Sequence, residues 1–93
     1  MTRDEIHASI FKVFYDRFEI NNPGLDEDLR AVYEFDSIDA IELLREIELM
    51  LETALTRDEK KAAMGIRTIR QIVDYVAVLA STRTATAGSL SQG

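Results

Sequence analysis

The residues best suited to chemistry are the pair Asp36 and Ser37, which Ile38 and Asp39 follow in the chain. A serine at the start of a helix is exposed, lies at the positive end of the helix dipole, and has a hydroxyl free for covalent modification. An Asp-Ser pair is also a common helix cap, so the tetrapeptide by itself leaves both interpretations open. The residues that follow it favour the modification site.

An amphipathic helix is predicted from about residue 37 to about residue 54. Its apolar residues have the spacing of one helix face, and they are Ala40, Leu43, Leu44, Ile47 and Leu51. Three carboxylates lie together on another face, those of Asp39, Glu42 and Glu46. Like charges at this spacing repel by about 0.2–0.5 kcal/mol each. A face of one sign therefore indicates a basic partner, although a merely solvated face has the same pattern.

With these residues the chain resembles the acyl carrier protein family. The resemblance rests on Asp36-Ser37-Ile38, on the acidic helix after it, and on residues 68–76, which look like the final helix of that family. It covers roughly residues 3–80. The resemblance implies that a dedicated transferase moves 4′-phosphopantetheine from coenzyme A onto the Ser37 hydroxyl. Acyl groups would then be carried as thioesters on the thiol of that arm, and Asp36 would be associated with the metal ion used during transfer.

The resemblance also implies partners with basic surfaces. These are the phosphopantetheinyl transferase and acyl-processing or synthase enzymes of fatty-acid, polyketide or specialised lipid biosynthesis. The expected contact residues are Ile38, Asp39, Glu42, Arg45, Glu46 and Glu48. If a medium-length acyl chain folds back into the protein, we expect it to lie among Phe14, Ile41, Leu44, Ile47 and Ile69.

Three departures from the family pattern concern the partners rather than the carrier role. Glu34 stands two residues before the aspartate, where the family usually has glycine. Arg45 interrupts the acidic face, and residues 57–61 are close to neutral where relatives are acidic. A specialised carrier is therefore at least as well supported as a housekeeping fatty-acid carrier.

The composition fits one small acidic domain. The chain has 93 residues, a net charge of −6 and no cysteine. Residues 26–52 contain ten acidic residues and two arginines, a local balance of −8. Such a segment disfavours nucleic acid as a partner. No apolar run approaches the roughly 18 residues of a membrane span, and the N-terminus has no signal-peptide core. We expect a cytoplasmic monomer.

The pattern of elements predicts an all-α fold, a small bundle of three long helices and one short helix with a long first loop. Capping boxes begin predicted helices at Thr2, Thr56 and Thr68, and Gly65 is the expected stop of the short helix. In the long connection over residues 19–35, a short helical turn is expected to dock on the core through Leu25, Leu29 and Val32. The last helix should bury Ile69, Ile72, Val73, Val76, Leu79 and Ala80. We expect a carrier domain over residues 1–80 and a disordered tail over residues 81–93.

Two other classes of function remain open. One is a helical adaptor whose acidic face binds a basic protein, with Ser37 merely a cap. The other is a small hydrolase, which is disfavoured because His7 is the single histidine and no nucleophile–base pair is evident. A calcium loop starting at Asp26 fails, since its sixth position would be Ala31 instead of glycine and its twelfth Ser37 instead of glutamate. We therefore predict no metal site and no catalytic site in the chain itself.

Overall fold

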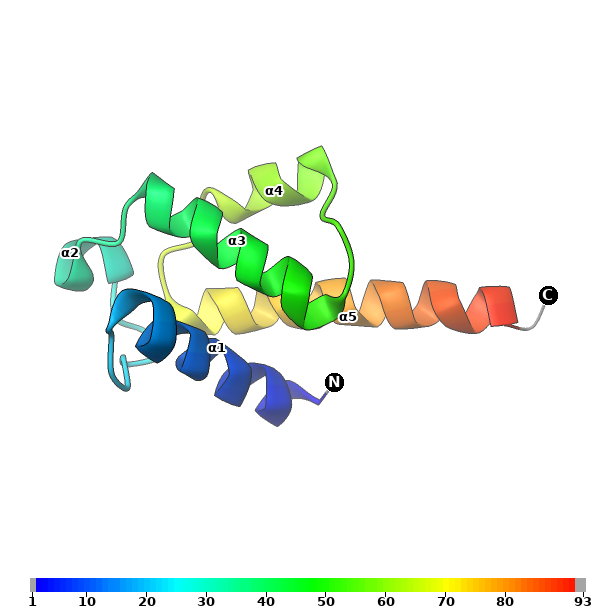
Figure 1. The fold of residues 1–93 in the computed structure, drawn as a ribbon, viewed down its shortest axis with the longest axis horizontal. Coiled ribbons are helices and arrows are strands. Elements are labelled where there is room, and N and C mark those ends of the chain that lie inside the picture. The colour runs from blue at the N-terminus through cyan, green and yellow to red at the C-terminus, as the bar shows by residue number, and fades with distance from the viewer. Residues whose placement is uncertain (1, 92–93) are drawn as a thin grey trace.

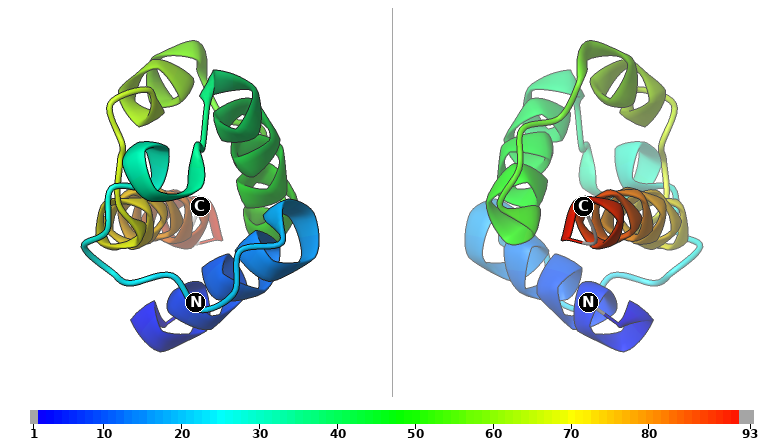
Figure 2. Two further views of the ribbon diagram at one scale, coloured as in Figure 1. Left: turned by 90° about the vertical axis from the view of Figure 1, so that its left-hand side faces the viewer. Right: turned by 90° about the vertical axis from the view of Figure 1, so that its right-hand side faces the viewer.

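The protein is a bundle of helices with one end closed by the first long loop. The computed structural model describes residues 2–91, with side chains described for residues 2–82. This part contains no strand, and its helices are α1 (Arg3–Phe18), α2 (Leu29–Tyr33), α3 (Ser37–Leu51), α4 (Arg57–Ala63) and α5 (Ile69–Ser91). Seen end-on, α1, α3 and α5 surround the core, and α4 lies across the side between α3 and α5 (Figure 2). The predicted all-α bundle of three long helices is confirmed, with two short helices instead of one.

Reciprocal capping contacts define where the helices begin. Thr2 and Thr56 each close a complete capping box with a glutamate three residues later, as the sequence predicted. The Thr68 hydroxyl accepts the Gln71 N–H at 3.2 Å, and the Gln71 side chain accepts the Thr68 N–H at 3.2 Å. Helix α3 has the same device, but its cap is Asp36 and not Ser37. Because each box satisfies two backbone donors, the helix starts are locally encoded.

The core is apolar and continuous through the bundle. Among residues 69–82 of α5, whose side chains are described, the buried ones are the six predicted, Ile69, Ile72, Val73, Val76, Leu79 and Ala80. They pack against Ile6, Ile10 and Phe14 of α1 and Leu43, Leu44 and Ile47 of α3. The described residues include no buried polar or charged residue. Burial of these apolar side chains therefore holds the three long helices together.

The loop between α1 and α3 is tied to the start of α5. The Leu29 N–H donates to the Arg67 carbonyl at 2.8 Å, and the Arg70 N–H donates to the Leu25 carbonyl at 3.0 Å. The Arg70 guanidinium also pairs with Asp26 at 2.8 Å and lowers the pKa of that carboxyl. Leu29 is buried as expected, but Val32 is 51% exposed. The prediction for Val32 was wrong because α2 is a single short turn whose outer side faces solvent.

One predicted helix end differs from the structure in position, and another differs in backbone conformation. Helix α3 ends at Leu51 instead of Ala54, since Glu52 takes a left-handed conformation with φ 53°. Helix α4 ends without a left-handed glycine, because Met64 keeps φ −65° and its N–H donates to the Lys61 carbonyl. The helix thus ends just before Gly65, at the predicted place, but Gly65 does not take the left-handed conformation usual for glycine at such a stop.

The last helix continues past the residues whose side chains are described. Ala80 is its last buried residue among those up to residue 82, and the helical backbone continues to Ser91 and projects beyond the bundle (Figure 1). The predicted tail thus begins as a continuation of α5, because extending an existing helix costs far less than starting one. Residues 92–93 lie outside the described residues. The division into a domain of residues 1–80 and a disordered tail of residues 81–93 stays a prediction.

Candidate functional site

Ser37 is the first residue of α3 and is held at the surface by a buried aromatic anchor. Phe35, two residues earlier, is 7% exposed. Its ring stacks on Phe14 with centroids 5.4 Å apart and meets Phe18 edge-on at 5.1 Å. The next residue, Asp36, caps the helix. The chain therefore leaves the core at Phe35 and turns directly into the helix that presents Ser37 to solvent.

The Ser37 hydroxyl is free for chemistry. The capping contacts around it belong to its neighbours: the Asp36 carboxylate accepts the Asp39 N–H at 3.0 Å, and the Asp39 carboxylate accepts the Asp36 N–H at 3.2 Å. Ser37 is exposed, and its side chain forms no hydrogen bond within the part of the chain that has described side chains. A cap-only role is thus excluded in this structure, since the capping side chain is that of Asp36.

The start of α3 suits a phosphate in one respect and opposes it in another. The first N–H groups of a helix lack intrahelical partners and point toward an anion bound there. The carboxylates of Asp36 and Asp39 lie beside Ser37 and would repel that anion. Asp36 is retained in this position for at least one structural reason, because it is the helix cap.

The predicted partner-binding residues of α3 do not share one face. Ile38 and Arg45 are exposed, and Glu42 is half-buried. Glu46, whose side chain is 14% exposed, turns toward α1 and pairs with Arg17 at 3.4 Å. Glu48 turns the other way, and its carboxylate accepts the Leu55 N–H at 2.8 Å. The predicted contact residues are therefore divided, because α1 engages Glu46 of the predicted acidic face, and the loop after α3 engages Glu48, which lies outside that face.

Sequence reasoning missed Leu49, which is 70% exposed and lies on the same side of α3 as Ile38 and Arg45. The signal that could have found it is spacing. Leu49 follows Ile38 by eleven residues and Arg45 by four, which are helical repeats of one face.

A small cavity lies between α2, α3, α4 and α5. Its volume is about 20 Å³, and its lining includes Leu29, Ala40, Leu44, Ile47, Ala63 and Ile66. Leu44 and Ile47 were expected to line a cargo site. Ile41, however, is 56% exposed, and Phe14 and Ile69 are buried elsewhere in the core. The space is large enough for about one water molecule, so a longer group could enter only if α3 and α4 moved apart.

The other residues considered for chemistry, His7 and the acidic loop residues, are engaged in packing or helix capping. His7 packs on Phe11 with ring centroids 4.4 Å apart, and its Nε2 is buried without a hydrogen-bond partner among the described residues. Asp28 caps α2 by accepting the N–H groups of Arg30 and Ala31. Within the described residues, no three His, Asp or Glu side chains gather as metal ligands. Nor does any described helix have the length and apolar character to cross a membrane.

Comparison with known families gives one result. The pattern of the family described as "Phosphopantetheine attachment site" matches residues 8–76. No curated protein and no solved structure matches the chain. The match spans α1 to the first half of α5, and so includes the exposed serine, its capping aspartate and the helices that hold them. The chain therefore belongs to the phosphopantetheine attachment-site family of carrier proteins, whose cofactor is 4′-phosphopantetheine.

Proposed function

We propose that the chain is an acyl carrier protein whose 4′-phosphopantetheine arm is attached to Ser37. The observation that carries this proposal is the exposed hydroxyl of Ser37 at the first position of α3, free of hydrogen bonds to the described side chains. The transferase would form a phosphodiester between this oxygen and the arm of coenzyme A, with 3′,5′-adenosine bisphosphate leaving and the hydroxyl proton released. Acyl groups would then be held as thioesters on the arm.

Asp36 has two roles in this proposal. Its carboxylate holds the first turn of α3 together, and it lies next to the oxygen that is modified. In that place it is available to the metal ion that accompanies coenzyme A during transfer, whose charge would offset the repulsion between phosphate and carboxylates. When bound, the arm supplies a thiol, which this chain without cysteine lacks.

The proposed partners are the phosphopantetheinyl transferase and acyl-processing or synthase enzymes of fatty-acid, polyketide or specialised lipid biosynthesis. The net charge of −6 supports electrostatic steering toward basic enzyme surfaces. Asp39 and Glu42 are the carboxylates of α3 nearest in sequence to Ser37. Contact by Glu46 and Glu48 stays a prediction, since both side chains are engaged within the molecule. We propose a cytoplasmic monomer that carries acyl groups between these enzymes and has no catalytic site of its own.

The test is incubation with coenzyme A and a broad-specificity phosphopantetheinyl transferase, followed by mass spectrometry of the intact protein. The wild type should gain the mass of one arm, and Ser37→Ala should gain none. Its melting temperature should stay close to that of the wild type, because Ser37 is not the cap. Ser9→Ala, on α1, is the matched control and should be loaded normally. Arm mass on Ser37→Ala would show that the assigned oxygen is wrong. A wild type that stays unmodified would favour the adaptor alternative.

A further inference from the structure

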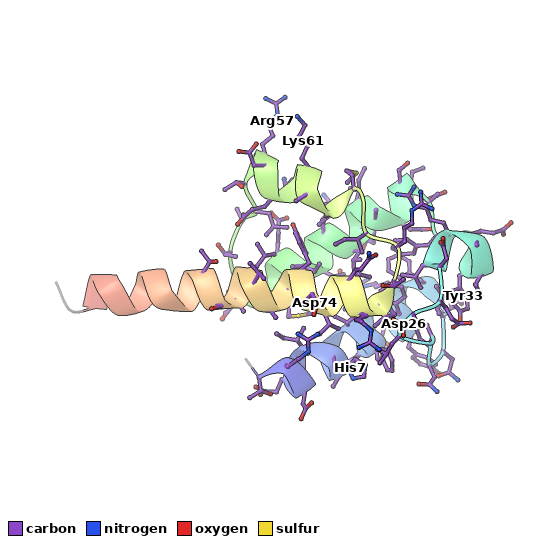
Figure 3. All side chains as sticks on the ribbon, turned by 180° about the vertical axis from the view of Figure 1, so that it is seen from behind. His7, Asp26, Tyr33, Arg57, Lys61 and Asp74 are labelled. Atoms are coloured by element: carbon purple, nitrogen blue, oxygen red, sulfur yellow. The ribbon has the colours of Figure 1, made fainter. Side chains whose placement is uncertain are left out.

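Helix α4 buries little of its own surface. Of its residues, all of which are described, only Ala63 is buried. The exposed side chains of Arg57 and Lys61 point away from the bundle (Figure 3). Near the start of α4, the Tyr75 hydroxyl of α5 donates to the Glu59 carbonyl at 2.6 Å. Elements with few buried apolar contacts open more easily than the rest of a fold, so the polar contacts that α4 makes with neighbouring helices have particular weight.

The C-terminal end of α4 is tied to α2 by Arg30. Its Nη2 atom donates a hydrogen bond to the Met64 carbonyl at 2.9 Å. The last carbonyls of a helix lack intrahelical partners and form its negative dipole end, so a cation is favoured there. Gly65 does not supply the left-handed ending that often satisfies such carbonyls. A side chain from another helix therefore does so. Arg30 forms no ion pair with a described residue, although Glu34 lies one turn further along.

Arg30 lies on a helix that is itself fixed to the bundle. Helix α2 begins at Leu29, which is 1% exposed and donates its N–H to the Arg67 carbonyl at 2.8 Å. Asp28 caps the helix by accepting the N–H groups of Arg30 and Ala31. Helix α2 is thus attached to the segment just before α5, and the Arg30 side chain extends this attachment to α4.

The bond from Arg30 lies beside the apolar cavity between α3 and α4. Arg30 follows Leu29 in the chain and Met64 follows Ala63, and both of these neighbours line the cavity of about 20 Å³. Ile66, two residues after Met64, lines it as well. The bond therefore joins two segments that would have to separate if the cavity widened at this end.

We propose that the hydrogen bond between Arg30 and the Met64 carbonyl is a latch that determines which acyl chains the protein shelters. This inference rests on the proposed function of Ser37. A medium-length chain can enter only if α4 moves, and that movement breaks the latch. A short acyl group or the free thiol leaves the latch intact. Arg30 is thus a positioning residue, which acts on the cargo through α4 and has no contact with the thioester.

The first experiment compares melting temperatures of the wild type and Arg30→Gln. Each is loaded from coenzyme A, acetyl-coenzyme A or octanoyl-coenzyme A. The substitution should lower melting of the free-thiol and acetyl forms by roughly 2–8 °C, the shift expected for losing one hydrogen bond in a small domain. The octanoyl form should be unchanged, because its latch is already broken. A contact that is merely structural would lower all three forms equally.

Two further variants serve as controls. Arg30→Lys keeps a cationic donor at the same position and should recover part of the lost melting temperature. Arg57→Gln removes a guanidinium that points away from the bundle (Figure 3), so all three forms of it should melt like the wild type.

Hydrogen exchange of the unmodified protein tests the latch without loading. The N–H groups of Met64 and Ile66 donate to the Lys61 and Ala63 carbonyls. Both should exchange about fivefold faster in Arg30→Gln, the factor expected for the net loss of one hydrogen bond, while amides in the middle of α1 keep their rates. Unchanged exchange at these two amides, or equal melting shifts in all three forms, would overturn the latch and leave Ser37 as the proposed attachment site. A wild type that accepts no arm would overturn the proposed function, and the exchange rates would still decide whether the latch exists.

Discussion

At the scale of single residues, the structure separates two roles that adjacent side chains perform. Asp36 forms the capping box of α3, while Ser37, one position later, keeps its hydroxyl free. A serine in the capping position would have used its oxygen to accept a backbone N–H. Placing the cap on the preceding aspartate leaves the Ser37 oxygen exposed while the start of the helix remains capped.

Substitutions of Asp36 can separate its capping role from its charge. Asparagine caps a helix about as well as aspartate, whereas alanine costs about 0.5–2 kcal/mol. Asp36→Asn should therefore keep the wild-type melting temperature but lose most of its loading rate, if the carboxylate assists transfer. Asp36→Ala should have both a lower melting temperature and a lower loading rate. Circular dichroism measures the melting temperature, and the loading assay measures the rate. Normal loading of Asp36→Asn would show that the negative charge is dispensable.

At the scale of the elements, three helices end with a glutamate in the left-handed conformation. Glu19, Glu34 and Glu52 have φ values of 57°, 55° and 53° and follow α1, α2 and α3. Glycine is the usual residue for such positions, because a side chain makes this conformation unfavourable by about 1–2 kcal/mol. Glu34 is the position at which the resemblance to acyl carrier proteins implied a glycine. A glycine there would adopt this left-handed backbone without strain.

Glu34→Gly should stabilise the protein. The gain is expected to be about 0.5–1 kcal/mol, since relief of the strained backbone exceeds the added flexibility of the unfolded chain. For a domain of this size, that is a rise in melting temperature of roughly 2–8 °C. Glu34→Ala serves as the control, because alanine removes the carboxylate but keeps the Cβ. Equal melting temperatures for the two variants would mean that the left-handed backbone imposes no measurable cost.

At the scale of the whole molecule, the question is whether the core admits cargo. The cavity of about 20 Å³ lies between α3 and α4 and is lined by apolar residues. It is too small for an acyl chain at its present volume. The helix α4 is short and lies across the side between α3 and α5 (Figure 2), so its displacement is the least costly way to enlarge the space. Cargo entry therefore requires a change in packing rather than a preformed pocket.

Acylated protein should melt at a higher temperature than protein carrying the free thiol. Each buried methylene contributes about 0.8 kcal/mol, so four of them offer roughly 3 kcal/mol, less what moving α4 costs. Comparing acyl with free-thiol protein cancels the effect of the arm. Ala63→Leu fills the cavity and should reduce the difference. An unchanged melting temperature for a medium-length chain would place the cargo in solvent, as expected for polar or polyketide-like groups.

Local sequence patterns were enough to predict where most helices begin and that Ser37 lies at the start of one of them. Capping boxes at Thr2, Thr56 and Thr68, and the apolar row of α5, depend only on neighbours in the chain, and all were confirmed. The same is true of Ser37 at the start of an amphipathic helix. These features follow from backbone donors and helical periodicity, which short segments specify by themselves.

Only the tertiary structure decided which sides of α3 are free. The periodicity of the sequence grouped Asp39, Glu42 and Glu46 on one face. It could not predict that α1 packs beside this face, where Arg17 pairs with Glu46. It also left Leu49 unnoticed, because the helical spacing of Leu49 from Ile38 and Arg45 becomes informative only when those side chains are known to be exposed. Exposure of a helix face depends on which neighbours cover it, and those neighbours come from distant parts of the chain.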